Sequence, residues 1–195
     1  NIKGKVMSYA SLYPATLHIH VLACRNLTPK DSNGKSDPYV VHKVLNRPKK
    51  KSSIKKKTLN PSWTLGTNSS SEVLNGEMDV RNLMSGVIFL DCWDHDTLSA
   101  DDFEGQVKLM VAKFLASGTK EQSRDSVVYA RGPVWEKLTP RIGKKEKVTG
   151  DMSISMKLEI PLHDEASIKV VDSALAAYET PKDEGGASAS SSSSS

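Results

Sequence analysis

The sequence has 195 residues, of which 37% are hydrophobic and 26% are charged. A chain of this length and composition can bury one sizeable core, so we expect one domain with extensions or at most two very small domains. No stretch approaches the roughly 20 consecutive apolar residues that a membrane-spanning helix needs, and no secretory signal peptide is visible. Any contact with a membrane is therefore expected to be peripheral.

Positive charge is concentrated in one segment. The formal net charge is +4, but residues 47–57 (RPKKKSSIKKK) hold seven cations and no acid, so the rest of the chain is net negative. A local basic patch indicates an anionic partner more strongly than a uniform excess of positive charge does.

The two cysteines, Cys24 and Cys92, lie inside apolar runs. A small secreted domain that is stabilised by disulfides normally has more cysteines. We therefore interpret both residues as reduced core thiols, and we expect a cytoplasmic protein.

Strands dominate the predicted elements. Residues 16–24 (TLHIHVLAC) alternate between the two faces as a half-buried strand does. The further strands expected in chain order are 37–45, 53–59, 86–93, 106–111, 126–130, 134–138 and 151–160. About eight short strands separated by turn residues predict an all-β fold, an eight-stranded antiparallel Greek-key β-sandwich with short helical insertions. Either residues 4–13 or residues 151–160 can supply one particular strand of the sandwich. The spacing of the sequence favours residues 151–160 as an integral strand of the domain.

Helical signals are sparse. Residues 112–117 predict one or two helical turns. Residues 164–178 predict a short amphipathic helix, because Ile168, Val171, Leu175 and Tyr178 share one face. We therefore divide the chain into a domain over residues 1–163, a short helix or linker over 164–180, and a disordered Ser-rich tail over 181–195.

Aspartates are concentrated in two loops that each follow an expected strand. The first loop is NLTPKDSNGKSDPYV, and the second is CWDHDTLSADDFEG. If both loops lie at the same end of the sandwich, their carboxylates converge, and like charges at close range oppose one another's ionisation unless a cation intervenes. Calcium takes roughly six to eight oxygen ligands, whereas strand cysteines and scattered histidines do not suit zinc. The pattern predicts a calcium site, with ordinary acidic turns as the alternative interpretation.

Three strings, NLTPKDSNGKSDPYV, KKTLNPSW and WDHDTLSADDFEG, resemble the C2 domains of synaptotagmins and conventional protein kinases C. The resemblance covers about residues 4–161, and the segment after Trp63 departs from the family's pattern. In that family, aspartates of the first and third loops bind calcium ions. The resemblance implies the carboxylate ligands Asp31, Asp37, Asp94, Asp96 and Asp102. It also implies Ser99 as an auxiliary ligand and the backbone carbonyls of Lys30 and His95 as ligands, with Asp101 outside the set.

The same resemblance implies a way of binding lipid. Calcium would make a negative loop end neutral or positive, and lipid phosphates would complete the coordination. Asn33 matches a position that contacts the serine headgroup of phosphatidylserine. Leu98 matches a loop-tip residue that enters the acyl boundary, whereas Ser32 replaces a tip residue that is usually apolar.

The lysine run matches the family's lysine-rich strand, which binds phosphoinositides. An alternating strand would put Lys49, Lys51, Lys55 and Lys57 on one face and Lys50 and Lys56 on the other. Tyr39 and Trp93 match two further members of that site. The alternative is an edge strand protected from aggregation by lysines, with Tyr39 and Trp93 as core residues.

We therefore expect a calcium-dependent, peripheral membrane-binding module and not an enzyme. Its partner would be an anionic membrane that contains phosphatidylserine or phosphatidylinositol bisphosphate, and the module would be a monomeric part of a larger trafficking or signalling protein. The alternative is a calcium-independent scaffold that uses its lysines to bind a phosphoinositide or a partner protein. Nucleic acid is disfavoured, because no aromatic residues interleave the lysines.

Overall fold

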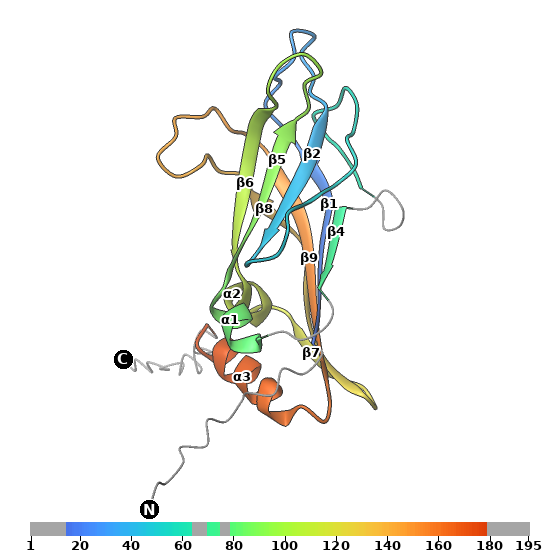
Figure 1. Cartoon of the computed structure of the whole chain (residues 1–195), viewed down its shortest axis with the longest axis vertical. Helices are drawn as coiled ribbons and strands as arrows, with labels where there is room; N and C mark the ends of the chain where they lie inside the picture. Colours follow the sequence, from blue (N-terminus) through green and yellow to red (C-terminus); the bar gives the residue numbers. More distant parts are fainter. Residues whose placement is uncertain (1–14, 64–69, 75–78, 179–195) are drawn as a thin grey trace, which may run out of the picture.

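Two antiparallel β-sheets pack face to face in the computed structural model, which describes residues 15–63, 70–74 and 79–178, with the backbone alone at 70–74. The strand order is β4-β1-β9-β8-β7 in the five-stranded sheet and β3-β2-β5-β6 in the four-stranded sheet (Figure 1). The strands are β1 (Thr16–Arg25), β2 (Pro38–Val44), β3 (Lys50–Lys51), β4 (Ser70–Leu74), β5 (Val87–Asp94), β6 (Asp102–Met110), β7 (Thr119–Gln122), β8 (Ser126–Lys137) and β9 (Asp151–Pro161). The predicted antiparallel β-sandwich is confirmed.

Alternating side chains explain why β1 and β9 line the core. Leu17, Ile19 and Val21 of β1 are buried, while the intervening histidines face outward and are half-buried. The two strands pair along almost their full length, and β9 also pairs with β8 on its other side. The segment 151–160 is therefore integral to the fold, as expected. Its competitor, residues 4–13, lies outside the described residues.

The strand expected at 53–59 is wrong. The edge strand β3 has only two residues, and the segment after it is irregular. Ser52 is the reason, because its hydroxyl accepts a hydrogen bond from the Val40 amide at 2.8 Å in place of a backbone carbonyl. A side chain that bonds to backbone competes with a regular β-ladder. The chain still follows β2 for a few residues, since the Lys55 amide donates to the Pro38 carbonyl.

Other strand boundaries also differ from expectation. The segments 126–130 and 134–138 form the single strand β8, whose register shifts between Arg131 and Val134. Strands β4 and β7 were not expected from the sequence. Strand β7 carries no buried side chain, so it has no hydrophobic alternation to reveal it.

The described residues form three helices, which gather at the end of the sandwich opposite the loops between β1 and β2 and between β5 and β6 (Figure 1). They are α1 (Val80–Ser85), α2 (Val111–Ala116) and α3 (Glu165–Ala176). Helix α1 was missed, whereas α2 and α3 lie where the sequence predicts helices. Helix α3 packs against α1 and α2 through the fully buried Val171, and Ile168 and Leu175 share that apolar face. Tyr178 lies beyond the helix end and is exposed.

None of the helices in the described residues is long and apolar enough to cross a membrane. The domain boundary placed before residue 164 stays a prediction.

Buried groups of β1, β2 and β5 include both thiols and one histidine. Cys24 and Cys92 are buried and unoxidised, as expected. His42 alternates with Val40 and Val44 on the inward face of β2 and is 2% exposed. Burial lowers the pKa of His42 to about 4, and the positive charge of Lys50 acts in the same direction.

The low pKa of His42 predicts a pH-dependent stability. Between pH 6.5 and 4 the unfolded chain binds a proton at this position that the folded chain does not, so stability falls as the pH falls through that window. The contribution is about 3 kcal/mol at its largest. We expect the His42→Gln variant to lose less free energy of unfolding between pH 7 and pH 4 than the parent, measured by urea denaturation. The exposed His163→Gln variant is the control, and an identical pH profile for all three proteins would contradict the prediction.

Candidate functional site

The two acidic loops meet at one end of the sandwich. Pro38, the first residue of β2, pairs with Asp94, the last residue of β5, and Asp94 also pairs with Asp102, the first residue of β6. The loop between β1 and β2 and the loop between β5 and β6 therefore leave the four-stranded sheet side by side, at the top of Figure 1. Stretches that are about sixty residues apart in the sequence are joined there by antiparallel pairing.

Local turn chemistry shapes the first loop. The Lys35 carbonyl accepts hydrogen bonds from the amides of Lys30 and Asp31, and the Gly34 amide donates to the Asp31 carbonyl. Gly34 has φ +75°, a value that favours glycine. Asn33 uses its side-chain oxygen to accept a hydrogen bond from the Lys35 amide at 2.8 Å. The loop is thus a closed turn with Asn33 exposed and Asp31 half-buried.

Asp94 lies at the centre of the acidic end and is 1% exposed. One of its oxygens, Oδ1, accepts a hydrogen bond from the Asp37 amide at 2.5 Å, which ties the two loops together. The other, Oδ2, is buried and has no hydrogen-bond partner among the described residues. Burial raises the pKa of Asp94, and the negative charges of Asp31, Asp96 and Asp37 raise it further against the effect of the Asp37 amide. The structure therefore brings these four carboxylates within electrostatic reach of one another.

Asp37 has an internal cation as its partner. The Lys56 ammonium lies 2.7 Å from Asp37 Oδ2, and the Lys57 amide donates to Asp37 Oδ1 at 2.7 Å. Although burial acts to raise the pKa of Asp37, these two donors hold it below its usual value. The sequence shows Lys56 as a member of the lysine run but does not reveal its contact with Asp37, because this contact depends on how the irregular segment after β3 folds back.

Asp101 organises the second acidic loop, a structural role that the sequence did not reveal. It accepts hydrogen bonds from the Tyr39 hydroxyl at 2.6 Å and the Asp96 amide at 3.1 Å, and His95 Nδ1 lies 3.1 Å from Asp101 Oδ1. The Tyr39 hydroxyl is the main cause of the lowered pKa of Asp101. Conversely, burial and Asp101 raise the pKa of the Tyr39 phenol.

The remaining expected ligands occupy the rim of this end. The Ser99 hydroxyl donates to Asp96 Oδ2 at 2.9 Å, so the auxiliary residue already contacts an expected ligand. The His95 amide donates to the Asp37 carbonyl at 3.1 Å. Asp102 is exposed at the start of β6, and Lys30 is half-buried. Leu98 is fully exposed at the loop tip.

Glu104 is an acidic residue that sequence reasoning did not identify. Its side chain is completely buried, and neither carboxyl oxygen has a hydrogen-bond partner of good geometry among the described residues. Burial raises its pKa to about 7, while Ser36 and Lys30 act in the opposite direction. The register shift of β6 opposite Cys92 and Trp93 places Glu104 there. Only the DFEG sequence around a glycine could have signalled such a bulge.

The side chains at this end match the donor chemistry of calcium. The donors are carboxylate, hydroxyl and carbonyl oxygens, which a hard divalent cation prefers, and the partnerless oxygen of Asp94 lies among them. Within the described residues, however, no three acidic, histidine or cysteine side chains are arranged closely enough to hold a metal ion. Lys56 and Ser99 instead contact Asp37 and Asp96. Calcium binding at these residues would therefore require that Lys56 leave Asp37.

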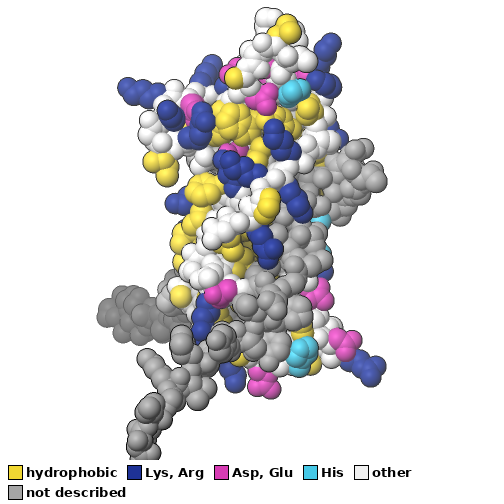
Figure 2. All heavy atoms as spheres, in the orientation of Figure 1, with side chains coloured by type: hydrophobic (Ala, Val, Ile, Leu, Met, Phe, Trp, Pro, Cys, Tyr) yellow, Lys and Arg dark blue, Asp and Glu magenta, His cyan; other side chains and the backbone are white. Residues whose placement is uncertain are grey.

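The lysine run lies along the β3 edge of the four-stranded sheet. Figure 2 shows lysine and arginine side chains over this face. The Lys51 ammonium lies 4.9 Å from the centre of the Tyr39 ring, since both residues point to the outer side of the sheet. The expected alternation beyond Lys51 does not occur, because β3 ends there. Lys49, Lys50 and Lys57 are exposed, and Lys55 is half-buried.

Trp93 and Tyr39 occupy the outer side of the same sheet. The Trp93 ring packs edge-on against Phe103 with 5.2 Å between ring centres, and the Arg141 guanidinium lies 5.2 Å from the Trp93 ring. Tyr39 is 5% exposed and Trp93 is half-buried. Both residues thus pack against neighbours, while Tyr39 also faces Lys51.

An antiparallel sandwich that presents loops at one end is a scaffold for binding modules. The family model described as the C2 domain matches residues 15–129, and the chain belongs to the C2 domain family. The chain is 30% identical over 161 residues to Ras GTPase-activating protein 4 of Mus musculus, covering 82% of this chain and 17% of that protein. It is 32% identical over 140 residues to a C2 and GRAM domain-containing protein of Arabidopsis thaliana, covering 72% of this chain and 12% of that protein. The chain thus spans less than a fifth of these relatives.

Solved structures with the same fold include synaptotagmin-like C2 domains. A C2 domain of plant extended synaptotagmin 1 aligns with a TM-score of 0.52 at 20% identity, covering 76% of this chain and 95% of that one. A structure of extended synaptotagmin 2 that comprises its SMP domain and two C2 domains aligns with a TM-score of 0.52 at 16% identity, covering 78% of this chain and 29% of that one. At these identities the similarity shows the fold.

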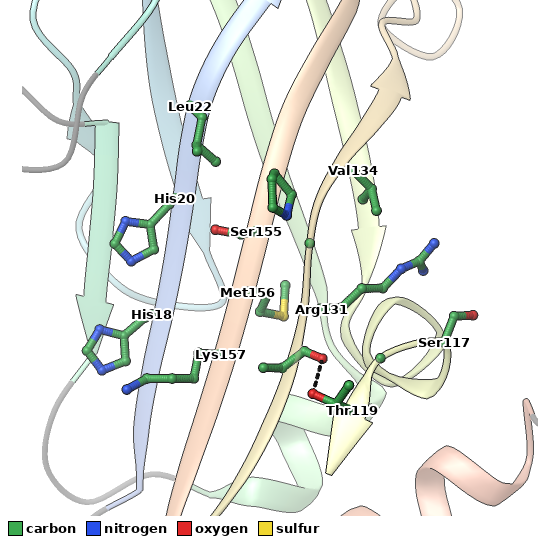
Figure 3. A pocket seen from close by; sticks show the side chains of 14 residues that line it. His18, His20, Leu22, Ser117, Thr119, Arg131, Val134, Ser155, Met156 and Lys157 are labelled. Carbon is green, nitrogen blue, oxygen red and sulfur yellow. Dashed lines mark hydrogen bonds between the residues drawn. The ribbon is translucent and has the colours of Figure 1, made fainter. Parts of the chain in front are cut away.

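A hollow of about 760 Å³ lies away from the acidic loops, on the outer side of the five-stranded sheet (Figure 3). His18 and His20 of β1 line one side, with ring centres 6.2 Å apart, and Arg131 and Thr119 line the other. Burial lowers the pKa of both histidines, and Lys157 acts in the same direction. Both histidines are half-buried.

Because Asp94 is buried near three other carboxylates, we predict that its negative charge destabilises the fold when no calcium is bound. Asp94→Asn removes a buried negative charge among three others but keeps the oxygen that accepts the Asp37 amide. We expect the variant to gain about 1 kcal/mol in free energy of unfolding at neutral pH with a chelator present. Urea denaturation measures the change, and Asp125→Asn, an exposed residue before β8, is the control. A loss of stability relative to the parent would contradict this account of Asp94.

Proposed function

We propose that this C2 domain is a calcium-dependent module that docks a larger protein on anionic membranes. The observation that carries the proposal is the buried Asp94 carboxylate, which has one partnerless oxygen and lies within electrostatic reach of Asp31, Asp37 and Asp96. Without a cation, the repulsion among these carboxylates is unfavourable, and a bound divalent cation would reduce it. Membership of the C2 family and the fold shared with synaptotagmin-like C2 domains support a lipid surface as the partner.

The proposed ligands are the carboxylates of Asp31, Asp37, Asp94, Asp96 and Asp102. Ser99 and the carbonyls of Lys30 and His95 complete the set. Calcium, when bound, would supply positive charge that attracts lipid phosphate. The chain's own residues do the rest: Asp101 holds the second loop through Tyr39 and the Asp96 amide, and the Asp37 amide fixes the orientation of Asp94.

Lys56 is an internal cation that would compete with calcium for the Asp37 carboxylate. In the structure its ammonium neutralises Asp37, so calcium would have to displace it. The released lysine would lie beside the acidic end and the lysine run, where anionic headgroups would be its next partner. Because the lysine side chain of this contact is largely exposed to water, the contact costs little to break.

Lipid contacts are proposed at two places. Exposed Leu98 would enter the interfacial region of the bilayer, and exposed Asn33 would contact a phosphatidylserine headgroup. The lysine side chains and their two aromatic neighbours would bind phosphoinositide headgroups, such as phosphatidylinositol bisphosphate, on the face of the sheet. These residues are Lys49, Lys50, Lys51, Lys55, Lys57, Tyr39 and Trp93. We further propose a cytoplasmic, monomeric module without catalytic activity that acts in trafficking or signalling.

Sedimentation with vesicles tests the calcium dependence. The parent should pellet with phosphatidylserine-containing vesicles in calcium and stay in the supernatant with a chelator. The double variant Asp94→Asn, Asp96→Asn should need a calcium concentration at least about tenfold higher than the parent to pellet with the vesicles. The reason is that two central negative charges of the proposed site have been removed.

The matched control is Asp125→Asn, which removes one exposed acid in the turn between β7 and β8 and should pellet like the parent. Pelleting of the double variant at the parent's calcium concentration would refute the proposal.

A second candidate function is calcium-independent binding of a phosphoinositide or a partner protein by the lysines. The exposure of Lys49, Lys50 and Lys57 and the placement of Lys51 over Tyr39 favour it. Each cation near an anionic bilayer contributes about 1 kcal/mol.

The variant Lys49→Gln, Lys51→Gln should therefore bind phosphatidylinositol bisphosphate vesicles roughly tenfold more weakly in a chelator. The control Lys113→Gln, Lys169→Gln removes two exposed lysines near the helical end. Equal affinity of both double variants in vesicle flotation would rule out the lysine face as the binding surface.

A further inference from the structure

A third loop leaves the sandwich at the same end as the acidic loops. It comprises residues 138–150 and is called the β8–β9 loop here. Lys137, the last residue of β8, pairs with Asp151, which also pairs with Arg25 at the end of β1. In Figure 1 this loop projects sideways from the upper part of the sandwich, in orange. The family model ends at residue 129, so the loop lies beyond the matched region.

The base of the β8–β9 loop is held firmly against the four-stranded sheet. Thr139 and Gln106 exchange two backbone hydrogen bonds of 2.9 Å. Arg141 forms an ion pair with Glu146, and its amide donates to Glu146 Oε2 at 3.0 Å. The Arg141 guanidinium also lies 4.5 Å from the centre of the Phe103 ring. These contacts fix the loop, so its tip has a defined direction.

The tip is a tight turn that presents one apolar side chain. The Lys144 amide donates to the Arg141 carbonyl at 3.0 Å, and Gly143 has φ +75°. A positive φ at the third residue is the signature of a type II turn, which needs glycine there. Ile142 precedes this glycine and is 85% exposed. Among the exposed large hydrophobic residues of the described chain, only Leu98 exceeds it.

Three lysines follow the exposed isoleucine in the sequence. Lys144, Lys145 and Lys147 follow it within five residues, and all three are exposed. The only acid in the loop, Glu146, is engaged by Arg141. The tip therefore combines an apolar side chain with net positive charge.

We propose that the β8–β9 loop is an additional membrane anchor, in which Ile142 enters the interfacial region of an anionic bilayer while Lys144, Lys145 and Lys147 bind the headgroups. This inference rests on the proposed function in taking a bilayer as the partner. The charges favour a bilayer over a protein, because lysine is depleted in the cores of protein interfaces but lies readily along anionic lipid. Lysine stems also cover apolar surface while their ammonium groups stay in water. The cations belong to the chain, so this contact needs no metal.

An environment-sensitive dye can report the anchor directly. Both native cysteines are buried, so a thiol introduced by Ile142→Cys is the accessible one for labelling. On addition of vesicles of phosphatidylserine and phosphatidylcholine, we expect a blue shift of the dye emission, and no shift with pure phosphatidylcholine vesicles. The control is the label at Ala166→Cys on α3, at the helical end, which should not respond.

Affinity gives the second measurement. The variant Ile142→Asn, Lys145→Gln, Lys147→Gln should bind anionic vesicles on the order of tenfold more weakly, since it loses one apolar anchor and two cations. The control Lys113→Gln, Lys169→Gln should bind like the parent. Neither set touches the expected calcium ligands, so both leave the proposed metal site intact.

The outcomes separate this inference from the proposed function. In the Asp94→Asn, Asp96→Asn background, a blue shift at position 142 supports the anchor, even if calcium proves to have no effect on pelleting. Vesicle binding with a silent dye at position 142 and parental affinity of the triple variant overturns the anchor and leaves the calcium-dependent module standing. Absence of binding to anionic vesicles under all conditions overturns both.

Discussion

The hydrogen bond from the Asp37 amide to the Asp94 carboxylate is the constraint on which the acidic end depends. It joins the loop that enters β2 to the loop that leaves β5, and it holds a carboxylate that is almost completely buried. A single neutral donor cannot offset the loss of water around a charge that has three negative neighbours, which is why the pKa of Asp94 is raised. The protein retains this unfavourable group at the point where its loops converge. Functional sites are where such unfavourable groups are commonly found.

Lys56 shows how the chain lowers this cost without a metal. Its ammonium lies against Asp37 at the edge of the acidic cluster, while the centre around Asp94 keeps its repulsion. An internal cation on the rim is a weak competitor, because the lysine side chain is largely exposed to water. Calcium binding would thus exchange one cation for another of higher charge. This exchange would couple the acidic loops to the segment that carries the lysine run, since Lys56 belongs to that run and contacts Asp37.

Sequence patterns predicted those features that depend on local order and failed where tertiary contacts decide. Strands β1 and β9 were found because alternating burial appears directly as alternating hydrophobicity. The strand expected at 53–59 was wrong, because the Ser52 hydroxyl replaces a backbone acceptor at Val40. The sequence placed both acidic loops at strand ends, and the antiparallel pairing of β5 with β2 and β6 is what brings them to the same end. In contrast, the roles of Lys56 and Asp101 depend on side-chain partners that are distant in sequence. Glu104 is buried only because a register shift turns it inward.

The outer side of the four-stranded sheet connects the two proposed lipid-binding regions. One edge carries the lysine run beside β3, and the other carries the β8–β9 loop, whose Arg141 packs on Trp93 and Phe103. The aromatic residues between them thus support cationic segments on both sides, through Lys51 over Tyr39 and through Arg141. A bilayer that contacts both edges would lie across this face as well as against the acidic loop tips. Because cations line both edges and acids gather at the end, neutralising the acids would remove the main electrostatic barrier to that contact.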